Sequence, residues 1–361
     1  MAITASRIKQ LAFECGFELV GITAAVPSED FARFDSWRSA GCAGEMAYLT
    51  DRRGDLRADP KNLLAAAKSM VCVGKLYNTA DPYSTDQTGT KNGWISRYAW
   101  GADYHDVLRD ALTRLIGKIA GEHDQPFDYR ICVDTAPLLE RSYARQAGLG
   151  WIGRNTCLIN QASGSWFFLG ELLLSIPLAA DSPAPNRCGT CTRCIEACPT
   201  AAIVPDETGQ WQIDARLCIS YLTIEKRGAI APQIASQTRN HLFGCDICQD
   251  VCPWNGRAPL TAEPAFSPAE FSPALERFAS FSEQDFRDAF RNSPVWRAKY
   301  SGFLRNVAWA MGNSGNAALL EPLSQLIYHS DPLVAASATQ ARQHLEQEVR
   351  GCEHSACVAS R

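Results

Sequence analysis

The sequence of 361 residues lacks an uninterrupted apolar stretch long enough to cross a bilayer. Its first residues, MAITASRIKQLAFECG, also lack the charged start and apolar core of a secretion signal, and their apolar positions instead follow the spacing of an amphipathic helix. With a formal net charge of -4, the chain has no global positive field that would attract nucleic acid or an acidic membrane. These absences predict a cytoplasmic protein without a membrane partner, in which any contact with nucleic acid depends on a local patch.

Nucleotide-binding motifs are scarce as well, since the sequence contains no P-loop. The nearest match to a dinucleotide fingerprint is Gly148-Leu-Gly-Trp-Ile-Gly153, which has the G-x-G-x-x-G spacing. A dinucleotide site places these glycines between a strand and the start of a helix, whereas here they follow the helical stretch Pro137–Ala147 and precede a strand. The pattern therefore favours Gly148 as the C-cap of that helix, with a tight loop after it.

Cysteine, in contrast, is abundant: the chain has 15. In a reducing compartment, regularly spaced cysteines indicate metal binding rather than a disulfide framework. The run Cys188-x2-Cys191-x2-Cys194-x3-Cys198-Pro199 matches the spacing of bacterial ferredoxins. The second run, Cys245-x2-Cys248-x3-Cys252-Pro253, has Leu242 where its first cysteine should stand, and Cys218 is the other cysteine of the block that can replace it. Eight thiolates then serve two 4Fe–4S clusters.

The crossed pairing of two-cluster ferredoxins divides these eight cysteines into two sets. One set is Cys188, Cys191, Cys194 and Cys252, and the other is Cys198, Cys218, Cys245 and Cys248. Zinc is the alternative metal, because CxxC pairs also build closed tetrahedral sites, although zinc has no need for the third cysteine of the first run. The remaining cysteines of the body of the chain lie in apolar contexts that indicate buried small side chains: Cys15, Cys42, Cys72, Cys132 and Cys157.

Residues 1–180 alternate strand and helix patterns, which predicts an α/β or α+β layer. The expected strands are Glu18–Thr23, Met70–Val73, Tyr129–Val133, Thr156–Asn160 and Trp166–Ser175, with a helix at Tyr104–Ala120. Proline-rich passages at Ala179–Asn186 and Pro259–Pro273 predict domains over residues 1–180, 181–258 and 259–361. The last part carries short helix patterns that resemble HEAT-type units, Gly302–Met311, Ala317–Tyr328 and Pro332–Leu345, followed by a frayed tail that contains Cys352, His354 and Cys357.

Two segments of the first half carry candidate functional residues. Asp134 stands between a strand and a helix pattern, where it either caps the helix Ala136–Ala147 or takes part in catalysis, and both roles remain open from the residues. The aromatic-rich segment from Arg97 to His105 either lines a flat cofactor or fills a core, and His105 itself reads as an ordinary hydrogen-bonded residue at a helix start.

Together, these segments resemble the epoxyqueuosine reductase family over essentially the full chain. The resemblance rests on Arg97–His105, Val133-Asp134-Thr-Ala-Pro137, Gly148–Thr156, the two cysteine runs, Arg216–Glu225 and the HEAT-like end. Members of this family use cobalamin and two 4Fe–4S clusters to reduce the epoxide of epoxyqueuosine at the wobble position of tRNA, and their catalytic core is similar to that of reductive dehalogenases. The resemblance therefore implies a cobalamin-binding first domain, a ferredoxin-like second domain and a tRNA-contacting third domain.

The resemblance also assigns one site residue, and polar neighbours of the shared motifs suggest others. The proposed proton donor of the family falls on Asp134, a role that requires burial to raise the pKa of this carboxyl group. We expect the cobalamin to lie among Arg57, Arg97, Tyr98, Asp134, Asn155 and Ser220. Because the sequence has no Asp-x-His-x-x-Gly signature, we expect no protein histidine on the cobalt.

The expected partners are a tRNA with a queuosine-type anticodon and a low-potential electron donor, bound by a monomer. Basic residues are in modest excess in one C-terminal segment: Arg287, Arg291, Arg297, Lys299 and Arg305. They either contact tRNA phosphates or form a solvated helix face. Two alternatives remain open. The first is a dehalogenase-like cobalamin enzyme that acts on a small molecule. The second is a non-catalytic iron–sulfur module that transfers electrons within a larger complex.

The crossed pairing generates the first testable prediction. Replacing Cys252 with Ala removes a ligand from the cluster held by Cys188, Cys191 and Cys194, so we expect loss of that cluster, measured by iron content and by electron paramagnetic resonance of the reduced protein. Loss of only the cluster that contains Cys245 and Cys248 would show that the pairing is wrong.

Overall fold

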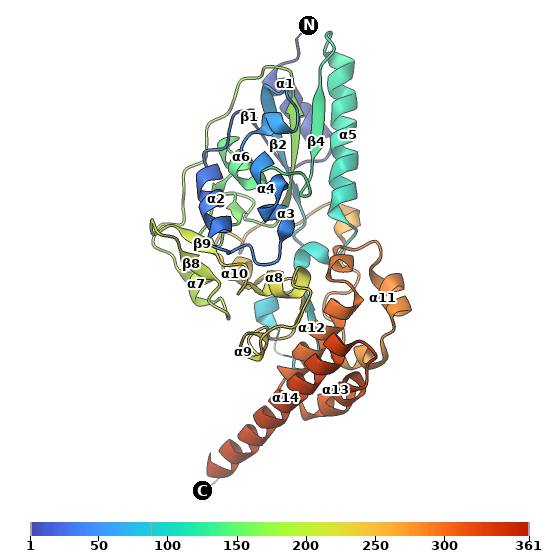
Figure 1. The fold of residues 1–361 in the computed structure, drawn as a ribbon. Helices are drawn as coiled ribbons and strands as arrows, with labels where there is room; N and C mark the ends of the chain where they lie inside the picture. The colour runs from blue at the N-terminus through green and yellow to red at the C-terminus, as the bar shows by residue number, and fades with distance from the viewer. Residues whose placement is uncertain (1, 88, 360–361) are drawn as a thin grey trace.

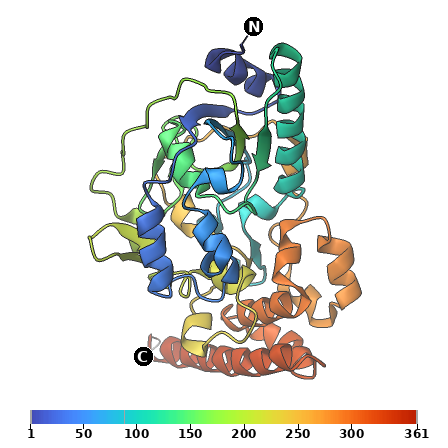
Figure 2. The ribbon, with the colours of Figure 1, turned by 45° about the horizontal axis from the view of Figure 1, so that its top comes forward.

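The structure is a computed structural model that describes residues 2–87 and 89–359, without the side chains of 351–359. A β-sheet with its helices forms one end of the molecule, the cysteine-rich segment lies in the middle, and a group of helices forms the other end (Figure 1). The two chain termini lie at opposite ends in both views (Figure 2).

The sheet has four strands in the order β1-β2-β7-β4, and all neighbouring strands are antiparallel. These strands are β1 (Leu19–Ala24), β2 (Ser69–Leu76), β7 (Phe167–Leu174) and β4 (Tyr129–Cys132). Every residue of β2 is buried, because both faces of the sheet are covered, and this explains the continuous apolar strand sequence. The antiparallel order confirms the mixed α+β expectation and excludes a parallel, doubly wound sheet.

Helices cover both faces of this sheet. On one face, α1 (Ala5–Glu14) and α5 (Tyr104–Glu122) pack their leucines and isoleucines against Val71, Val73 and Leu172. On the other face, α6 (Glu140–Gln146) packs Tyr143 and Ala144 against Met70 and Leu173. The short helices α2 (Phe31–Ser39), α3 (Ala47–Thr50) and α4 (Arg52–Leu56) connect β1 to β2, and β5 (Trp151–Ile152) pairs with β6 (Leu158–Ile159) beyond α6.

The cysteine-rich segment consists of short elements. They are α7 (Arg193–Glu196), the antiparallel pair β8 (Ile203–Pro205) and β9 (Trp211–Ile213), α8 (Ile219–Ile224), α9 (Pro232–Ala235), β10 (His241–Phe243) and α10 (Ile247–Asp250). Strand β10 pairs in parallel with β3 (Trp94–Ile95), so the segment is tied into the first half of the chain by backbone hydrogen bonds.

The C-terminal helices are α11 (Glu283–Phe290), α12 (Tyr300–Gly312), α13 (Leu320–Ile327) and α14 (Pro332–Ala359). They share one apolar core with Trp94, Trp100 and the segment around Leu222 and Phe243, so this core crosses both predicted domain boundaries. The boundaries and the HEAT-like nature of the helices stay predictions. Short 3-10 helices complete the fold at Pro60–Asn62, Ser84–Asp86, Arg97–Ala99, Pro264–Phe266, Leu275–Ser280, Pro294–Ala298 and Ala317–Leu319.

Most expected elements are present, with three differences. The strand expected at Thr156–Asn160 is only the two-residue β6, because the chain turns back on itself at this point to pair with β5. The helix expected from Ala136 begins at Glu140. Helix α14 continues to Ala359, where the sequence predicted a frayed end, because no proline follows Pro332 to stop it. The side chains of Cys352, His354 and Cys357 lie outside the described residues.

Gly148 ends α6, as the sequence predicted. Its φ angle is 81°, and its N–H and that of Leu149 donate to the carbonyl groups of Arg145 and Ala144. A Cβ atom on Gly150 would lie 2.2 Å from the carbonyl oxygen of Ile159, so this glycine permits the close β5–β6 pairing. The G-x-G-x-x-G sequence therefore builds a helix end and a hairpin.

Arg305 of α12 is fully buried, which makes its assignment to a tRNA-binding patch wrong. Its guanidinium donates to the carbonyl oxygens of Leu222, Lys226 and Gly228 and to the side chain of Asn306. Burial lowers the pKa of Arg305 to about 10, so the group remains charged at neutral pH. This residue fastens the C-terminal helices to α8 and the loop after it.

Replacing Arg305 with Met removes these charge-assisted hydrogen bonds and leaves buried carbonyl groups without a donor. We expect the free energy of unfolding to fall by about 3 kcal/mol or more. The matched variant Arg287→Met, on an exposed part of α11, is expected to change it by less than about 0.5 kcal/mol. Urea unfolding of the anaerobically purified protein measures both values, and equal effects would contradict the anchoring role.

Candidate active site

Asp134 lies on the loop between β4 and α6 and has a φ angle of 50°, which is unfavourable for a residue other than glycine. Its backbone N–H donates to Oε1 of Glu140 at 2.6 Å, so the first residue of α6 holds the loop in this conformation. The position before the helix is Leu139, which makes no side-chain capping hydrogen bond. Asp134 therefore does not cap α6, because the helix starts too late for its carboxylate to reach the free N–H groups.

The side chain of Asp134 instead meets His105 at the start of α5. Nε2 of His105 lies 3.2 Å from Oδ2 of Asp134, and Nδ1 lies 2.7 Å from Oδ1 of Asp103. Asp103 also caps α5 through the backbone N–H of His105, as expected for the acid that precedes a helix. His105, for which the sequence indicated only a helix-start role, thus bridges two carboxylates.

The charges of this group follow from its contacts. Desolvation lowers the pKa of His105, but hydrogen bonds and charges from Asp103 and Asp134 outweigh it and raise the pKa to about 9. Desolvation raises the pKa of Asp134, but His105, with contributions from Arg297 and Tyr104, brings it below its ordinary value. At neutral pH Asp134 is therefore a carboxylate, and the proton beside it is on His105. A role as proton donor requires a raised pKa of Asp134, and this requirement is not met.

A cavity of about 260 Å³ opens in front of Asp134. One part of its lining is polar, and the other part is aromatic, where Tyr104 stacks on Phe168 with ring centroids 4.2 Å apart. The lining residues are Tyr77, Tyr104, Asp134, Glu140, Arg141, Cys157, Leu158, Ser165, Phe167, Phe168, Leu169 and Gln249. Sequence reasoning missed Glu140 and Arg141, although two adjacent charged residues at the start of an apolar helix pattern are a signal that could have identified them.

The C-terminal part of the chain contributes Arg297 to this region. Its Nε atom donates to Oε1 of Glu225 at 2.6 Å, and its guanidinium lies 5.4 Å from the ring centroid of Tyr48. The positive charge of Arg297 is one of the causes that lower the pKa of Asp134. Of the basic residues expected to contact tRNA, Arg297 is thus brought near the candidate active site, whereas Arg305 is buried in the core.

Three of the residues predicted around the cofactor, Arg57, Arg97 and Tyr98, do not line the cavity of Asp134. Arg57 is buried and donates to the carbonyl oxygens of Tyr48 and Arg53. Tyr98 lies edge-on to Tyr104. Arg97 is 2% exposed, and its guanidinium donates to backbone carbonyls of the loop at 79–82 while it packs against Trp100, so its N–H groups point into the fold.

The two other residues predicted around the cofactor, Asn155 and Ser220, hydrogen bond with cysteines. Asn155 is buried, donates to the carbonyl oxygen of Cys248 at 3.2 Å and accepts the N–H of Cys157 through Oδ1. Ser220 hydrogen bonds to the thiol of Cys218, which offsets part of the rise in the pKa of this thiol caused by burial. Both residues therefore position sulfur atoms.

The eight spaced cysteines form two groups. Burial raises the pKa of Cys194 to about 11, and nearby Cys252, Cys188 and Cys191 contribute to this shift. Burial likewise raises the pKa of Cys245 well above its ordinary value, with contributions from Cys218 and Cys198. The pKa of Cys248 is also raised, by a hydrogen bond with Cys157, by burial and by the nearby Cys245 and Cys218. Four sulfur ligands in each group fit the donor set of a 4Fe–4S cluster. Among the described residues, no three His, Cys, Asp or Glu side chains are spaced to hold a single metal ion.

Cys157 departs from the expectation of a buried small side chain, whereas Cys15, Cys42, Cys72 and Cys132 confirm it. A hydrogen bond with Cys248 lowers the pKa of Cys157, and its side chain lines the cavity of Asp134. Cys157 therefore marks where one group of cluster cysteines meets the candidate active site.

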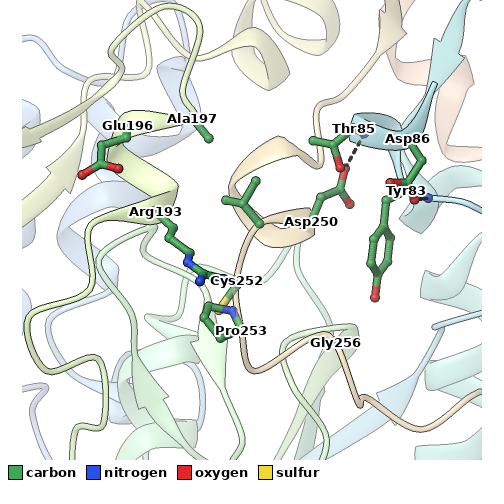
Figure 3. Close-up of a pocket in the computed structure, with 11 residues that line it drawn as sticks. Tyr83, Thr85, Asp86, Arg193, Glu196, Ala197, Asp250, Cys252, Pro253 and Gly256 are labelled. Atoms are coloured by element: carbon green, nitrogen blue, oxygen red, sulfur yellow. Dashed lines mark hydrogen bonds between the residues drawn. The ribbon is translucent and has the colours of Figure 1, made fainter. Parts of the chain in front are cut away.

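A second hollow, of about 640 Å³, lies beside Cys252 and shares no lining residue with the cavity of Asp134 (Figure 3). Asp250 lines it, accepts hydrogen bonds from Ser84 and Thr85, and has its pKa raised by burial to about 7. Tyr83 and Arg193 line the same hollow.

Across the residues that the structure describes, no helix has the length and apolar character needed to span a membrane.

Comparisons with known proteins identify two segments of the chain. A family model described as "Epoxyqueuosine reductase QueG, DUF1730" matches residues 57–135, and one described as "4Fe-4S double cluster binding domain" matches residues 187–255. The first segment includes His105 and Asp134, and the second includes all eight spaced cysteines.

Relatives named epoxyqueuosine reductase match most of the chain. An epoxyqueuosine reductase of Xanthomonas campestris is 41% identical over 335 residues, which cover 91% of this chain and 93% of the relative. That of Escherichia coli is 41% identical, with 86% of this chain and 81% of the relative covered.

Solved structures agree with this similarity. A crystal structure of epoxyqueuosine reductase with a tRNA-Tyr epoxyqueuosine-modified tRNA stem loop has a TM-score of 0.83, 29% identity, and coverage of 94% of this chain and 89% of the other. A Bacillus subtilis epoxyqueuosine reductase, described with its catalytic aspartate loop swung out of the active site, has a TM-score of 0.83 and 28% identity, and 94% and 90% of the two chains are covered.

The bridging role of His105 gives a pH-dependent prediction. Because the folded-state pKa of His105 is about 9 and the ordinary value is 6.5, its stabilising contribution is fully present below about pH 6.5 and is lost as the pH rises through 9. We expect the melting temperature of His105→Gln to lie below that of the unsubstituted protein near pH 6 and to approach it above pH 9. A difference in melting temperature that is the same over this whole range would contradict the assignment.

Proposed function

The chain belongs to the epoxyqueuosine reductase family, and from this premise we propose that the residues around Asp134 reduce the epoxide of epoxyqueuosine at the wobble position of tRNA to queuosine. The electrons pass through two 4Fe–4S clusters to cobalamin. Cys157 carries this assignment to particular residues. Its side chain lines the Asp134 cavity, and it hydrogen bonds with Cys248, a cysteine of one cluster group.

The two clusters are held by crossed sets of ligands: Cys188, Cys191, Cys194 and Cys252 hold one, and Cys198, Cys218, Cys245 and Cys248 hold the other. The grouping of the thiols around Cys194 and Cys245 supports this division. Cys248 of the second set is adjacent to Cys157, so these cysteines would hold the cluster nearer the cavity. The first set would then hold the cluster that receives electrons from a low-potential donor.

The lining of the Asp134 cavity would hold cobalamin, because it offers aromatic rings at Tyr104 and Phe167 next to polar groups. When bound, cobalamin supplies a cobalt centre that strong reduction turns into a nucleophile or a reductant. Arg57 and Tyr98 support the cofactor near Asp134, while Asn155 and Ser220 position cluster cysteines. Arg97 acts indirectly, by holding the loop at 79–82.

Conversion of an epoxide to an alkene consumes two electrons and two protons and expels the ring oxygen as water. A proton must reach this oxygen as its bond to carbon breaks, because an alkoxide is a poor leaving group. Asp134 lies within hydrogen-bond distance of the protonated His105, so it passes a proton from His105 to the oxygen. In this role Asp134 is a relay that His105 reloads.

Residues 1–180 bind cobalamin, residues 181–258 hold the clusters, and the HEAT-like residues 259–361 contact the tRNA. The relative with a bound stem loop supports the tRNA substrate. Arg297, near Asp134, together with Arg287, Arg291 and Lys299 on the same part of the chain, offers phosphate contacts. The wobble base must leave its stack to reach the cavity, as in other enzymes that act on bases. We expect a cytoplasmic monomer.

Anaerobic purification with added cobalamin, followed by a spectrum and incubation with tRNA that contains epoxyqueuosine, tests this function. We expect cluster and corrinoid absorption and the formation of queuosine under strong reduction. A dehalogenase-like enzyme would bind the corrinoid without acting on the tRNA, and an electron-transfer module would hold clusters without a corrinoid. Either result would refute the proposal.

Replacing Asp134 with Asn keeps the size of the side chain but removes the proton relay. We expect turnover to fall by at least about 100-fold while the cluster and corrinoid spectrum stays unchanged. Asp106→Asn, at an exposed position of α5, is the matched control and is expected to retain full turnover. Unaltered turnover of the Asp134 variant would exclude this residue from proton transfer.

A further inference from the structure

Glu171 is a fully buried carboxyl group in the middle of the central sheet. It is 0% exposed, it lies on β7, and no N–H or hydroxyl group of the described residues donates to either of its carboxylate oxygens. Its neighbours across the sheet are Cys72 of β2 and Cys132 of β4, which carry no positive charge. A bare carboxylate in this position would be strongly unfavourable, so Glu171 carries a proton. Burial, followed by the charge of Glu140, raises its pKa well above the ordinary value.

Glu140 connects this buried acid to the active site. Its carboxyl group lies close enough to that of Glu171 for a hydrogen bond once one of the two acids carries a proton, and it also accepts the backbone N–H of Asp134 and lines the cavity in front of it. A proton on Glu171 therefore satisfies both acids, since its O–H donates to Glu140. The pair forms a continuous path from the interior of the sheet to the cavity.

Several charged groups surround the pair. Burial raises the pKa of Glu140 to about 8, the charge of Asp134 adds to this shift, and Arg141 opposes it. Arg57 and Tyr104 also face Glu140: burial lowers the pKa of Arg57, which the charge of Glu140 partly opposes, and burial with the charges of nearby acids, Glu140 among them, raises the pKa of Tyr104. From the sheet, the thiols of Cys72 and Cys132 have pKa values raised by burial, so they remain neutral. At neutral pH the pair therefore holds at least one proton.

The reduction consumes two protons, and the His105–Asp134 relay accounts for one of them. We propose that Glu140 and Glu171 form a buried proton store, and that Glu140 donates the second proton to the departing oxygen in the cavity. This inference rests on the proposed function, because it assigns a source for a proton that this reaction requires.

Each of the two protons accompanies the cleavage of one C–O bond of the epoxide. The first proton comes from His105 through Asp134 as the first C–O bond of the ring breaks and the oxygen becomes a hydroxyl group. The second proton comes from the carboxyl group of Glu140 as the second C–O bond breaks, and water leaves. The two electrons delivered through the clusters complete the C=C bond. Glu140 is left as a carboxylate, which Glu171 reprotonates, and solvent restores the pair after the product leaves.

A positioning role for Glu140 predicts a different outcome from proton donation. Glutamine retains the side-chain oxygen that accepts the N–H of Asp134, but it cannot act as an acid. If Glu140 only holds the loop, Glu140→Gln should behave like the unsubstituted enzyme. If Glu140 donates a proton, the variant should lose the rate of the chemical step while the loop remains in place.

Single-turnover conversion of epoxyqueuosine-containing tRNA by the cobalamin-loaded enzyme separates these roles. We expect Glu140→Gln to slow the reaction by at least about 100-fold at saturating tRNA, with an unchanged half-saturating tRNA concentration. Because donation needs the protonated acid, the rate of the unsubstituted enzyme should fall as the pH rises through about 8, and the variant should lack this fall. The same rate and pH profile in both proteins would overturn the proposal.

Infrared difference spectra provide a readout that does not depend on activity. We expect Glu171→Gln and Glu140→Gln to lose a carbonyl band of a protonated carboxylic acid at neutral pH. Glu14→Gln, at an exposed glutamate paired with Arg7 and Lys118, is the matched control and should retain the band. Absence of the band in the unsubstituted protein would overturn the proton store, whereas a band in a protein that forms no queuosine would overturn the proposed function alone.

Discussion

The candidate active site depends on one hydrogen bond, from the backbone N–H of Asp134 to the carboxyl group of Glu140. This bond holds Asp134 in the left-handed backbone region, where a residue with a side chain is strained unless its surroundings fix it. Because the loop turns in this way, the carboxylate of Asp134 points to His105 and away from the start of α6. The result is an ionised carboxylate between two groups that carry protons.

Electrons and protons reach this point from different parts of the fold. The cysteine groups approach through Cys157, and the proton carriers belong to α5, α6 and the central sheet. The arrangement requires the whole chain, because β3 pairs with β10 and the largest core crosses the predicted domain boundaries. Arg305 and Arg297 show the same dependence, since both come from the C-terminal part and contact residues near the clusters or the active site.

Local patterns in the sequence predicted what local physics determines. The cysteine spacing, the buried strands β2 and β7, and Gly148 as a helix C-cap depend on residues a few positions apart. The environments of His105, Glu171 and Arg305 could not be predicted in this way, because each depends on partners far away in the sequence. The state of Asp134 is the clearest example, since a histidine 29 residues earlier keeps it ionised.

Infrared difference spectroscopy of the unsubstituted protein against Asp134→Asn at neutral pH tests most directly whether Asp134 is a carboxylate between two proton carriers. We expect the variant to lose the symmetric and antisymmetric bands of a carboxylate, because His105 keeps Asp134 ionised. Loss of the carbonyl band of a protonated acid would contradict it, and would make Asp134 itself the stored proton.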